Sequence, residues 1–429
     1  MERFVVRPGG PLHGTVRAGG AKNSALKLMA ACLLAPGRHV LAGVPRIVDV
    51  EIMSEVLGAI GAQVTRDADD SGGGPGDLVV DTPATLIPAA PYELVEKMRA
   101  SVVVLGPLLA RSGRASVSLP GGDDFGNRPI DIHLHGLSTL GAAFQTVHGN
   151  IEGRVPGGAG ARLVGQRVVF EYPSHTATDN VLMAAVLAKG TTVIENAARE
   201  PEVSDLADFL THMGARIRGA GTSHIEVDGV EELHPSPIAH RVIPDRVVAA
   251  TLLAAVGVAG GEILVEDGRP DHMDMLLRKM GEIGVEVSQA PEGMRATSSG
   301  RLHSTDVATL PYPGVATDYK PFLVTMLSVA DGVGIVTENL FSGRFRYVDE
   351  LRRMGADIRT EGHHAVVRGV RRLSGAPVRA PDLRAGAALV LAGMTAEGET
   401  VVSDAQHIDR GYEDLASTLS SLGADVTRA

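Results

Sequence analysis

The sequence predicts an α/β fold of the α+β kind, in which six repeated units form two lobes of three units each. Two interleaved sequence patterns and the composition of the helices support this prediction. The first pattern is a leucine followed a few residues later by Gly-Ala and an alternating apolar residue, as in Leu57…Gly61-Ala62. Self-similarity at a period of roughly 70 to 80 residues is typical of a repeated structural unit. The pattern occurs six times, weakened to Gly-Val in one copy, with its glycines at Gly61, Gly141, Gly214, Gly284, Gly355 and Gly423.

The second pattern is a helix rich in small residues that ends in glycine and passes into a strand, as in Leu187–Gly190 before Thr191–Ile194. Glycine takes the left-handed conformation at a helix end at little cost, so each copy predicts the end of a helix. The alternative is chance recurrence of a common dipeptide, and it fits poorly with two patterns that keep the same order. The glycines of this second pattern are Gly37, Gly113, Gly190, Gly260-Gly261, Gly332 and Gly398.

Several predicted helices are apolar on more than one face, as in Val181–Leu187 and Ala385–Leu391. A helix that is apolar all round is buried. We therefore expect the helices inside each lobe and the sheets outside, as an inside-out α/β barrel.

Composition excludes several classes of protein. The chain has 429 residues, 44% of them hydrophobic, and a single cysteine, so neither a disulfide framework nor a thiolate metal cluster is expected. A net charge of −11 and the absence of tryptophan argue against nucleic-acid binding. The most apolar stretch, Val247–Ala259, is too short to span a membrane. Because residues Met1–Phe4 do not resemble the start of a signal peptide, we expect a cytoplasmic protein with no membrane partner.

Two glycine-rich segments are candidates for ligand binding. Gly19–Ser24 precedes the helical run Ala25–Leu34, and helix N-termini attract anions, with Lys22 adding a positive charge there. An ordinary capped helix is the alternative. Leu119–His133 contains Pro120-Gly121-Gly122, the carboxylate pair Asp123-Asp124 and an arginine, so it can fold tightly around a ligand. A solvated surface loop is the alternative here.

Two shorter segments are weak candidates when each is taken alone. Thr317-Asp318 stands in a Pro/Gly-rich approach to a helix, where Asp318 is equally well explained as an N-cap. His407–Tyr412 carries Arg410 just before the last predicted helix, and a structural salt bridge would also account for that arginine.

Together these segments resemble those of one family, the enolpyruvyl transferases, and the resemblance covers essentially the whole chain. It is closest to the peptidoglycan branch of that family. The family fold is two lobes of three repeated units with buried helices, and we place the first lobe at residues 1–20 plus 241–429 and the second at 21–240. The matching segments are Gly20–Asn23, Met98–Ser101, Pro120–Gly122, Arg128-Pro129, Glu195–Pro201, Pro244–Arg246, Thr317-Asp318, Asp382–Arg384 and His407–Tyr412.

The resemblance implies transfer of the enolpyruvyl group of phosphoenolpyruvate to the 3-hydroxyl of UDP-N-acetylglucosamine. Phosphate is released by addition and then elimination, in the first committed step of peptidoglycan synthesis. No metal or organic cofactor is implied. Asp123 matches the general acid that protonates the methylene carbon, and Asp318 matches the base near the acceptor hydroxyl. A trianionic donor needs several cations, and Lys22, Arg128 and Arg410 match the donor-binding cations of the family. Arg99 and Arg384 match further basic residues around the cleft.

The resemblance also implies an acceptor site, in which Asn23 holds the sugar. The nucleotide pocket would be formed by Arg128, Pro129, Ile130, Asp131, Ile132, Tyr172, Ser174, His175 and Leu340. The expected partners are therefore phosphoenolpyruvate and a uridine nucleotide or nucleotide sugar.

The chain departs from the family at Asp123, where many members carry cysteine. A subset of the family has a carboxylic acid there, so activity is still expected. Asp123 must then be protonated before the step, which implies a raised pKa. We also expect insensitivity to fosfomycin, an epoxide that alkylates the cysteine. The single cysteine, Cys32, is interpreted as a small core residue on an apolar helix.

The second departure is His175-Thr176, where the family usually has Val-Gly. That segment contacts the nucleotide diphosphate in the family, so the acceptor pocket of this chain can differ. The peptidoglycan acceptor is the first hypothesis. A UMP-like acceptor of nucleoside-antibiotic synthesis, whose phosphate His175 and Thr176 would bind, is the alternative. A further alternative is a non-catalytic paralogue that binds nucleotide sugars, although Lys22 and Asp318 are both present.

Overall fold

The computed structural model describes residues 2–66, 76–119, 130–158, 160–299, 301–341 and 343–429. The described chain folds into two compact units. Unit 1 holds residues 2–19 and 244–429, and unit 2 holds the described residues from Gly20 to Ile243. Each unit has its own cluster of buried apolar side chains. The chain thus crosses from unit 1 to unit 2 after its first two strands and later returns.

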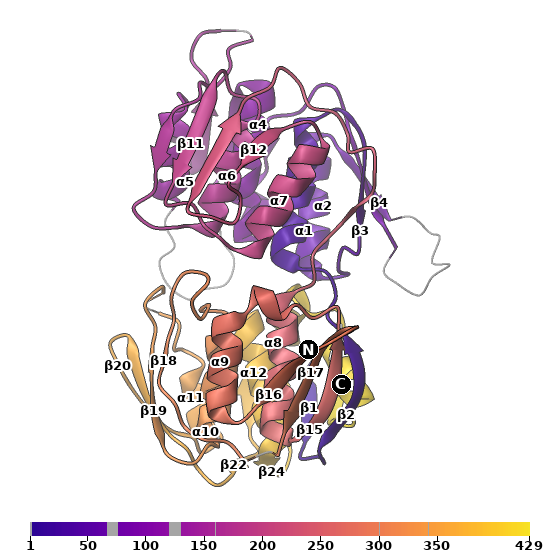
Figure 1. The fold of residues 1–429 in the computed structure, drawn as a ribbon, viewed down its shortest axis with the longest axis vertical. Helices are drawn as coiled ribbons and strands as arrows, with labels where there is room; N and C mark the ends of the chain where they lie inside the picture. The colour runs from indigo at the N-terminus through magenta and orange to yellow at the C-terminus, as the bar shows by residue number, and fades with distance from the viewer. Residues whose placement is uncertain (1, 67–75, 120–129, 159, 300, 342) are drawn as a thin grey trace. The chain divides into compact units, whose positions relative to one another are not determined.

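Unit 2 contains the first helices of the chain (Figure 1). Its helices, 3₁₀ helices (η) included, are α1 (Lys22–Ala31), η1 (Cys32–Leu34), α2 (Val48–Ile60), α3 (Tyr92–Val95), η2 (Arg99–Val104), α4 (Leu105–Ser112), α5 (Asp131–Thr139), α6 (His175–Ala185) and α7 (Pro201–His212). Its strands are β3 (Gly37–Ala42), β4 (Gln63–Arg66), β5 (Leu78–Thr82), β6 (Ala89–Ala90), β7 (Arg114–Ser118), β8 (Ala143–Val147), β9 (Asn150–Arg154), β10 (Arg167–Val169), β11 (Thr191–Glu195), β12 (Arg216–Arg218), β13 (His224–Asp228) and β14 (His240–Arg241).

Unit 1 contains both ends of the chain (Figure 1). Its helices are α8 (Arg246–Ala259), η3 (Pro270–His272), α9 (Asp274–Ile283), α10 (Lys320–Ser328), α11 (Val348–Arg353), α12 (Leu383–Thr395), η4 (Ala405–Arg410) and α13 (Leu415–Ser421). Its strands are β1 (Phe4–Arg7), β2 (Leu12–Arg17), β15 (Gly261–Glu266), β16 (Glu286–Ala290), β17 (Gly293–Ser298), β18 (Val307–Ala308), β19 (Val333–Thr337), β20 (Asp357–Glu361), β21 (His364–Arg368), β22 (Leu373–Ser374), β23 (Pro377–Arg379), β24 (Ala396–Glu397), β25 (Thr400–Ser403) and β26 (Asp425–Arg428).

The sheets confirm the prediction of six repeats. Within the described ranges there are six four-stranded sheets, three per unit, and one two-stranded sheet, β22-β24. In the sheet β14-β3-β5-β4 the first pair is parallel and the other two pairs are antiparallel. The same pairing pattern recurs in β6-β7-β9-β8, β10-β11-β13-β12, β2-β15-β17-β16, β18-β19-β21-β20 and β23-β25-β1-β26. These sheets are separate and open, and the described strands form no closed barrel.

The sixth sheet is completed by the two ends of the chain. In the other five four-stranded sheets the hairpin strands follow one another in sequence, as β12 and β13 do. In the sixth, β26 pairs with β1, where Phe4 lies opposite Arg428. Strand β1 also pairs with β25, where Phe4 lies opposite Val402. The first strand therefore belongs to the last repeat.

The glycines of both patterns adopt the predicted backbone conformation. The six glycines of the Gly-Ala pattern have φ between 87° and 112°. The glycines of the helix-to-strand pattern have φ between 67° and 120°. Only glycine adopts these angles without steric cost, because it lacks Cβ. The prediction of helix ends is confirmed for the Gly-Ala pattern and for Gly113 and Gly260-Gly261, which follow the last helical residue by one or two positions. The other glycines of the second pattern stand three to five residues beyond the helix, at or before the start of a strand.

The placement of helices inside and sheets outside is also confirmed. In unit 1, α8, α10 and α12 contact one another, and α12 is buried from Leu383 to Met394. In unit 2, α4 contacts α6, and α6 is buried from Ala177 to Ala185. The strands carry alternating buried and exposed side chains, as in β21, so one face of each sheet packs on the helices.

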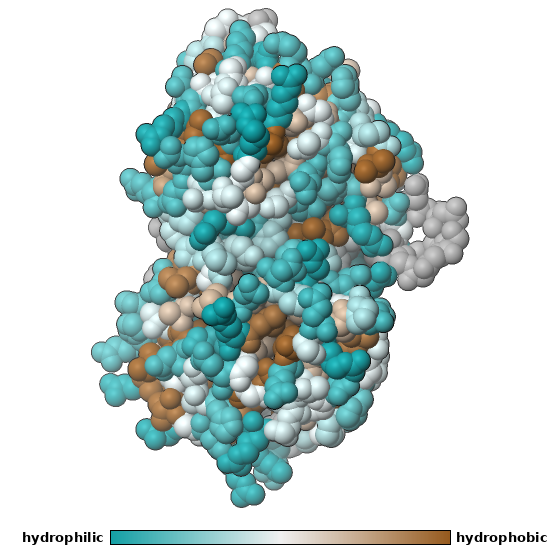
Figure 2. Space-filling view, in the orientation of Figure 1, coloured by the Kyte–Doolittle hydropathy of each residue, from teal (hydrophilic) through white to brown (hydrophobic). Residues whose placement is uncertain are grey.

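The outer face of one sheet in unit 1 carries exposed apolar side chains. Val333 and Ile335 on β19 are 47% and 45% exposed, and Ile335 lies opposite Val366 of β21. Figure 2 shows apolar surface gathered among polar residues over the strands β18 to β20. Among the helices described, none has the length and apolar content needed to cross a membrane.

Candidate active site

Cationic side chains begin the buried helices of both units. In unit 1, Arg246 begins α8, Lys320 begins α10 and Arg384 is the second residue of α12. In unit 2, Lys22 begins α1, Arg99 begins η2, which runs into α4, and His175 begins α6. A cation at the positive end of a helix dipole is unfavourable unless a carboxylate or a bound anion is close by. These helix starts are therefore the candidate anion-binding positions of each unit.

Asp318 lies at the centre of the charged cluster in unit 1. It stands just before α10, and its side chain is 28% exposed. Its Oδ1 is 2.7 Å from Nη2 of Arg344, and its Oδ2 is 3.6 Å from Nε of Arg384. The structure thus brings together two predicted residues, Asp318 and Arg384.

The electrostatics of this cluster keep Asp318 ionised. Burial by itself raises the pKa of its carboxyl group, but the guanidinium groups of Arg344, Arg384 and Arg246 hold that pKa well below its usual range. The pKa of Arg344 is raised in turn by Asp318 and Asp382, against the effect of burial. Asp318 is therefore a carboxylate at neutral pH and accepts hydrogen bonds; its role as the base stays a prediction.

Helix caps position the arginines of unit 1. Asp382 caps α12, where its Oδ1 accepts hydrogen bonds from the backbone N–H groups of Arg384 and Ala385 at 2.8 and 2.9 Å. Asp245 caps α8 in the same way and so fixes the start of the helix at Arg246. The Arg246 Nη1 then donates to the hydroxyl of Tyr319 at 3.0 Å. Each arginine follows its capping residue by one or two positions, so the cap orients its backbone.

Arg384 is almost completely buried, at 1% exposure, yet it is not saturated with hydrogen bonds. Its Nε and Nη1 have no hydrogen-bond acceptor within the described structure. Its guanidinium lies 5.4 Å from the ring of Tyr412, whose hydroxyl is 2.8 Å from the Oγ1 of Thr251 on α8. The carboxylate of Asp318 lies 3.6 Å from Nε, beyond hydrogen-bonding distance, so these two buried donors lack an acceptor among the described residues, which is costly.

Lys22 is the first candidate site residue of unit 2 along the chain. Its Nζ forms a 2.7 Å ion pair with Oδ2 of Asp49 in the first turn of α2, and both side chains are buried. Asn23 follows it on α1 and is partly exposed. This ion pair fixes the ammonium group of Lys22 at the start of α1. The resemblance named Lys22, but it did not point to Asp49.

Arg99 and His133 define a second part of unit 2. Burial lowers the pKa of Arg99, and burial together with the charge of Arg99 lowers the pKa of His133 to about 3. His133 is thus neutral, and its tautomer follows from Asn180. The amide oxygen of Asn180 accepts from Gly106 N, so its Nδ2 donates to Nδ1 of His133 at 3.1 Å. The proton of His133 is on Nε2, which lies 3.2 Å from Oγ1 of Thr176.

The start of α6 holds the predicted nucleotide segment. Ser174 caps this helix and accepts from Ala177 N at 3.4 Å. The Nε2 of His175 is 3.3 Å from Nζ of Lys27 and 3.4 Å from Oδ2 of Asp179. His175 and Thr176 thus both contact buried polar groups of unit 2, and their role toward a phosphate stays a prediction. The adjacent Tyr172 is exposed.

The remaining predicted residues are distributed over both units. Ile130 precedes α5, which begins with Asp131 and Ile132 in unit 2. Leu340 follows β19 and Arg410 ends η4, both in unit 1. Asp123, Arg128 and Pro129 lie outside the described residues. Cys32 is fully buried, and burial raises the pKa of its thiol well above the ordinary value, as expected of a core residue.

Sequence reasoning missed Arg344, although this residue makes the shortest contact with Asp318. It stands in Gly343–Arg346, which carries no recognisable pattern. It also missed Lys320 and Glu338, which form a fully buried ion pair of 2.8 Å. The recurrence of an aspartate one or two residues before a cation, as in Asp318…Lys320 and Asp382…Arg384, is a signal that could have found Lys320.

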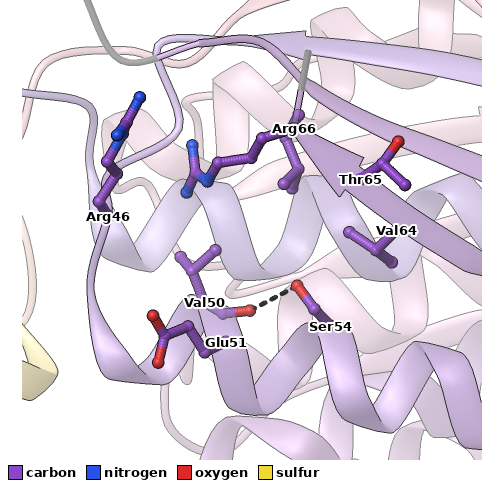
Figure 3. A pocket seen from close by; sticks show the side chains of 8 residues that line it. Arg46, Val50, Glu51, Ser54, Val64, Thr65 and Arg66 are labelled. Atoms are coloured by element: carbon purple, nitrogen blue, oxygen red, sulfur yellow. Dashed lines mark hydrogen bonds between the residues drawn. The ribbon is translucent and has the colours of Figure 1, made fainter. Parts of the chain in front are cut away.

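A pocket of about 370 Å³ in unit 2 is separate from these residues. Figure 3 shows it where α2 faces β4, with Arg46 and Arg66 beside Glu51 and Ser54. The guanidinium of Arg66 donates to the carbonyl oxygens of Val44 and Pro45 at 3.0 and 2.8 Å, so it organises the loop before α2. None of the predicted site residues lines this pocket.

Comparison with known proteins identifies the class. The family model of EPSP synthase (3-phosphoshikimate 1-carboxyvinyltransferase) matches residues 6–419. The chain therefore belongs to the enolpyruvyl transferase family, and it is a carboxyvinyl transferase.

Three similar relatives carry the same name. The UDP-N-acetylglucosamine 1-carboxyvinyltransferase of Nocardia farcinica is 49% identical over 427 residues, covering 100% of this chain and 98% of the relative. That of Myxococcus xanthus is 47% identical over 429 residues, covering 100% and 99%. That of Mycobacterium tuberculosis is 48% identical over 427 residues with the same coverage as in Myxococcus.

Solved structures support the fold. The enolpyruvyl transferase NikO from Streptomyces tendae has a TM-score of 0.86 at 24% identity, covering 100% of this chain and 99% of that one. The EPSP synthase from Acinetobacter baumannii has a TM-score of 0.74 at 17% identity, covering both chains completely. At these identities the likeness concerns the fold alone, and it confirms the predicted fold class.

Proposed function

We propose that this enolpyruvyl transferase moves the enolpyruvyl group of phosphoenolpyruvate to the 3-hydroxyl of UDP-N-acetylglucosamine, in the first committed step of peptidoglycan synthesis. The observation that carries the proposal is the 47–49% identity, over the full chain, to relatives that bear this activity in their names. The ionised Asp318 among buried guanidinium groups supports it. The substrates are small molecules, and a cytoplasmic location is part of the proposal because phosphoenolpyruvate is a cytoplasmic metabolite.

The reaction needs an acid, a base and several cations. In the addition, the acceptor oxygen bonds to C2 of phosphoenolpyruvate while its proton passes toward Asp318. A proton from Asp123 goes to the methylene carbon, which gives a tetrahedral ketal. In the elimination, the new methyl group loses a proton and the C2–O bond to phosphate breaks. Inorganic phosphate leaves, and the acceptor carries a vinyl ether.

The cations bind the charges of the donor. Lys22, Arg99, Arg128, Arg384 and Arg410 are assigned to its phosphate and carboxylate groups, since charge-assisted hydrogen bonds are strongest where water is excluded. The buried, unsatisfied Nε and Nη1 of Arg384 support this assignment. Asn23 is assigned to the acceptor sugar. The residues that match the nucleotide pocket of the family, His175 among them, are assigned to its nucleotide.

A second acceptor stays open because of His175-Thr176, where the family usually has Val-Gly. Their contacts with Lys27 and His133 place extra polar groups at the start of α6. A terminal phosphate, as in UMP, is the chemistry that such groups favour. The acceptor is therefore the part of the proposal that most needs a direct test.

The test measures phosphate release from phosphoenolpyruvate with UDP-N-acetylglucosamine and with UMP in parallel, and mass spectrometry of the product follows. We expect release, and a carboxyvinyl adduct, with UDP-N-acetylglucosamine only. Release with UMP alone would overturn the acceptor assignment but keep the chemistry. Release with neither acceptor would favour a nucleotide-sugar-binding protein without turnover. Asp318→Asn serves as the matched inactive control.

A further inference from the structure

Glu338 is a buried carboxylate in unit 1 that no sequence motif and no ligand role explains. Its side chain has no solvent exposure. Its Oε1 accepts hydrogen bonds from Thr309 Oγ1 at 2.7 Å and from the backbone N–H groups of Leu340 and Phe341 at 2.8 and 3.3 Å. Its Oε2 accepts from Thr317 Oγ1 at 2.7 Å and lies 2.8 Å from Nζ of Lys320. Five donors thus converge on one carboxylate.

Lys320 neutralises Glu338 and holds the loop that follows it. The Nζ of Lys320 donates to the backbone carbonyl of Arg344 at 2.6 Å and lies 3.9 Å from the ring of Phe345. Burial lowers the pKa of Lys320 to about 8, although the charge of Glu338 opposes this shift. The pair therefore fixes the backbone at Leu340-Phe341 and at Arg344.

Thr317 connects this pair to Asp318 through hydrogen bonds whose donors and acceptors are determined. Because Glu338 only accepts hydrogen bonds, the Thr317 hydroxyl must donate to it and presents its lone pairs elsewhere. Those lone pairs accept a 3.0 Å hydrogen bond from Nη1 of Arg344. The other terminal nitrogen of Arg344, Nη2, is 2.7 Å from Oδ1 of Asp318. One oriented chain thus runs from Glu338 through Thr317 and Arg344 to Asp318.

We propose that Glu338 and Lys320 are positioning residues, which act through the Thr317 hydroxyl and the Arg344 backbone to hold the Arg344 guanidinium on Asp318. This inference rests on the base role proposed for Asp318. The groups that face Asp318 are Arg344 from the loop before α11, Arg384 from α12 and Arg246 from α8. Of these, Arg344 is tied to the Glu338 network through the Thr317 hydroxyl and through its own backbone carbonyl. Without that tie, Asp318 loses one of the charges that keep it ionised and oriented.

The sharpest variant is Thr317→Val, which keeps the shape of the side chain and removes the hydroxyl. Arg344 Nη1 then has no acceptor at that point. We expect kcat to fall about 10- to 100-fold, the loss typical for one hydrogen bond to a charged group. We also expect the acid limb of the kcat–pH profile to move to higher pH, because a loosened Arg344 depresses the pKa of Asp318 less. Thr317→Ser, which retains the hydroxyl, should restore both.

The control is Thr325→Val on α10, a buried threonine whose hydroxyl donates only to the Ala388 carbonyl at 3.4 Å. It should leave kcat and the pH profile close to those of the unchanged protein. Lys320→Met is the second variant. It removes the bond to the Arg344 carbonyl and should lower kcat and move the acid limb in the same direction. Folding of each variant is checked by its melting curve.

Three outcomes test this inference, and the first two separate it from the proposed function. If Thr317→Val behaves like Thr325→Val while Asp318→Asn is inactive, the positioning role is wrong and the base role stands. If Asp318→Asn retains most of its activity, the base role is wrong and the inference falls with it. If Thr317→Val lowers kcat with no change in the pH profile, the network does not act on the charge of Asp318, and the inference is overturned.

Discussion

At the scale of single residues, the charge state of Asp318 decides which role it can take. A carboxylate beside three guanidinium groups is ionised at neutral pH and cannot act as a general acid. It is also a weak base while those arginines face it, because they stabilise its ionised form. An anionic donor that draws Arg384 toward itself would raise the basicity of Asp318, while Arg344 keeps that carboxylate in place. Binding of the donor and activation of the base are thus linked through Arg384.

Asp123 carries the acid role in the proposed reaction, so its proton is indispensable. Asp123→Asn keeps the size of the side chain but cannot donate a proton to carbon. We expect turnover to fall about 10²- to 10⁴-fold, the usual contribution of a general acid, with acceptor binding largely unchanged. Steady-state phosphate release and calorimetric binding of UDP-N-acetylglucosamine measure the two quantities. Retention of most of the activity would remove Asp123 from this role.

The same aspartate predicts insensitivity to fosfomycin. Opening an epoxide requires a strong nucleophile such as a thiolate, and a protonated carboxyl group is a poor one. Cys32 cannot substitute for it, because it is fully buried and its thiol stays protonated. We expect no covalent adduct in intact mass spectrometry after incubation with the drug. Asp123→Cys should become sensitive, and an adduct on the unchanged sequence would mean that the acid is misassigned.

At the scale of elements, the starts of the buried helices carry the function, and their caps hold the cations in place. Asp382→Ala removes the cap of α12, two residues before Arg384. We expect a loss of about 1 kcal/mol of stability together with a raised KM for phosphoenolpyruvate, because Arg384 loses its fixed backbone. Thermal melting and steady-state kinetics measure the two effects.

The matched control for this experiment is Asp414→Ala, which removes the cap of α13. Asp414 accepts from Ser417 N at 2.9 Å on the surface of unit 1. A similar loss of stability with unchanged KM is expected there. Equal effects of the two substitutions on KM would show that the cap of α12 matters only for folding.

Helix α6 contains a second element-scale prediction, at Asp179. Burial raises the pKa of this carboxyl to about 7, against the attraction of Lys27, and neither oxygen has a hydrogen-bond partner in the described structure. A carboxyl whose pKa is raised on folding destabilises the protein above its unfolded pKa of about 4. That cost grows as pH rises from about 4 to about 7 and disappears below about 4.

The measurement compares the free energy of unfolding of the unchanged protein and of Asp179→Asn from pH 5 to pH 8. The variant mimics the protonated carboxyl, so its advantage in stability should grow with pH up to about 7 and then level off. Each unit of pKa shift corresponds to about 1.4 kcal/mol in the free energy of unfolding. A difference that does not vary with pH would mean that Lys27 compensates Asp179 fully at all pH values.

At the scale of the whole molecule, the chain builds two separate cores, and its first strand belongs to the core that contains its last. Phe4 on β1 is 1% exposed and packs in unit 1. Phe4→Ala should cost about 3–5 kcal/mol and lower amide protection in β25 and β26. Hydrogen exchange read by mass spectrometry measures this loss strand by strand.

Phe209→Ala on α7 is the reciprocal variant, since Phe209 is fully buried in unit 2. It should lower protection in β11 and β13 and leave β25 and β26 unchanged. Loss of protection in both units from either substitution would contradict two independently stabilised cores.

The local features of this protein were predictable from its sequence because they depend on short-range physics. Glycine positions determine where helices end, and both sets of glycines show the expected positive φ. Apolar composition on all sides indicates which helices are buried, as α12 shows. The resemblance placed Asp318, Lys22 and Arg384, each in a recognisable short motif.

Tertiary structure alone decided which charged side chains form ion pairs. Arg344 pairs with Asp318 from a loop 26 residues further along the chain, and Lys22 pairs with Asp49 on another helix. Nothing in the local sequence distinguishes these partners from solvated surface charges. The strength of an ion pair depends on its burial and on the distance between its charges. Both are set only when helices distant in sequence pack together. The same holds for β1, whose pairing with β25 and β26 joins the two ends of the chain.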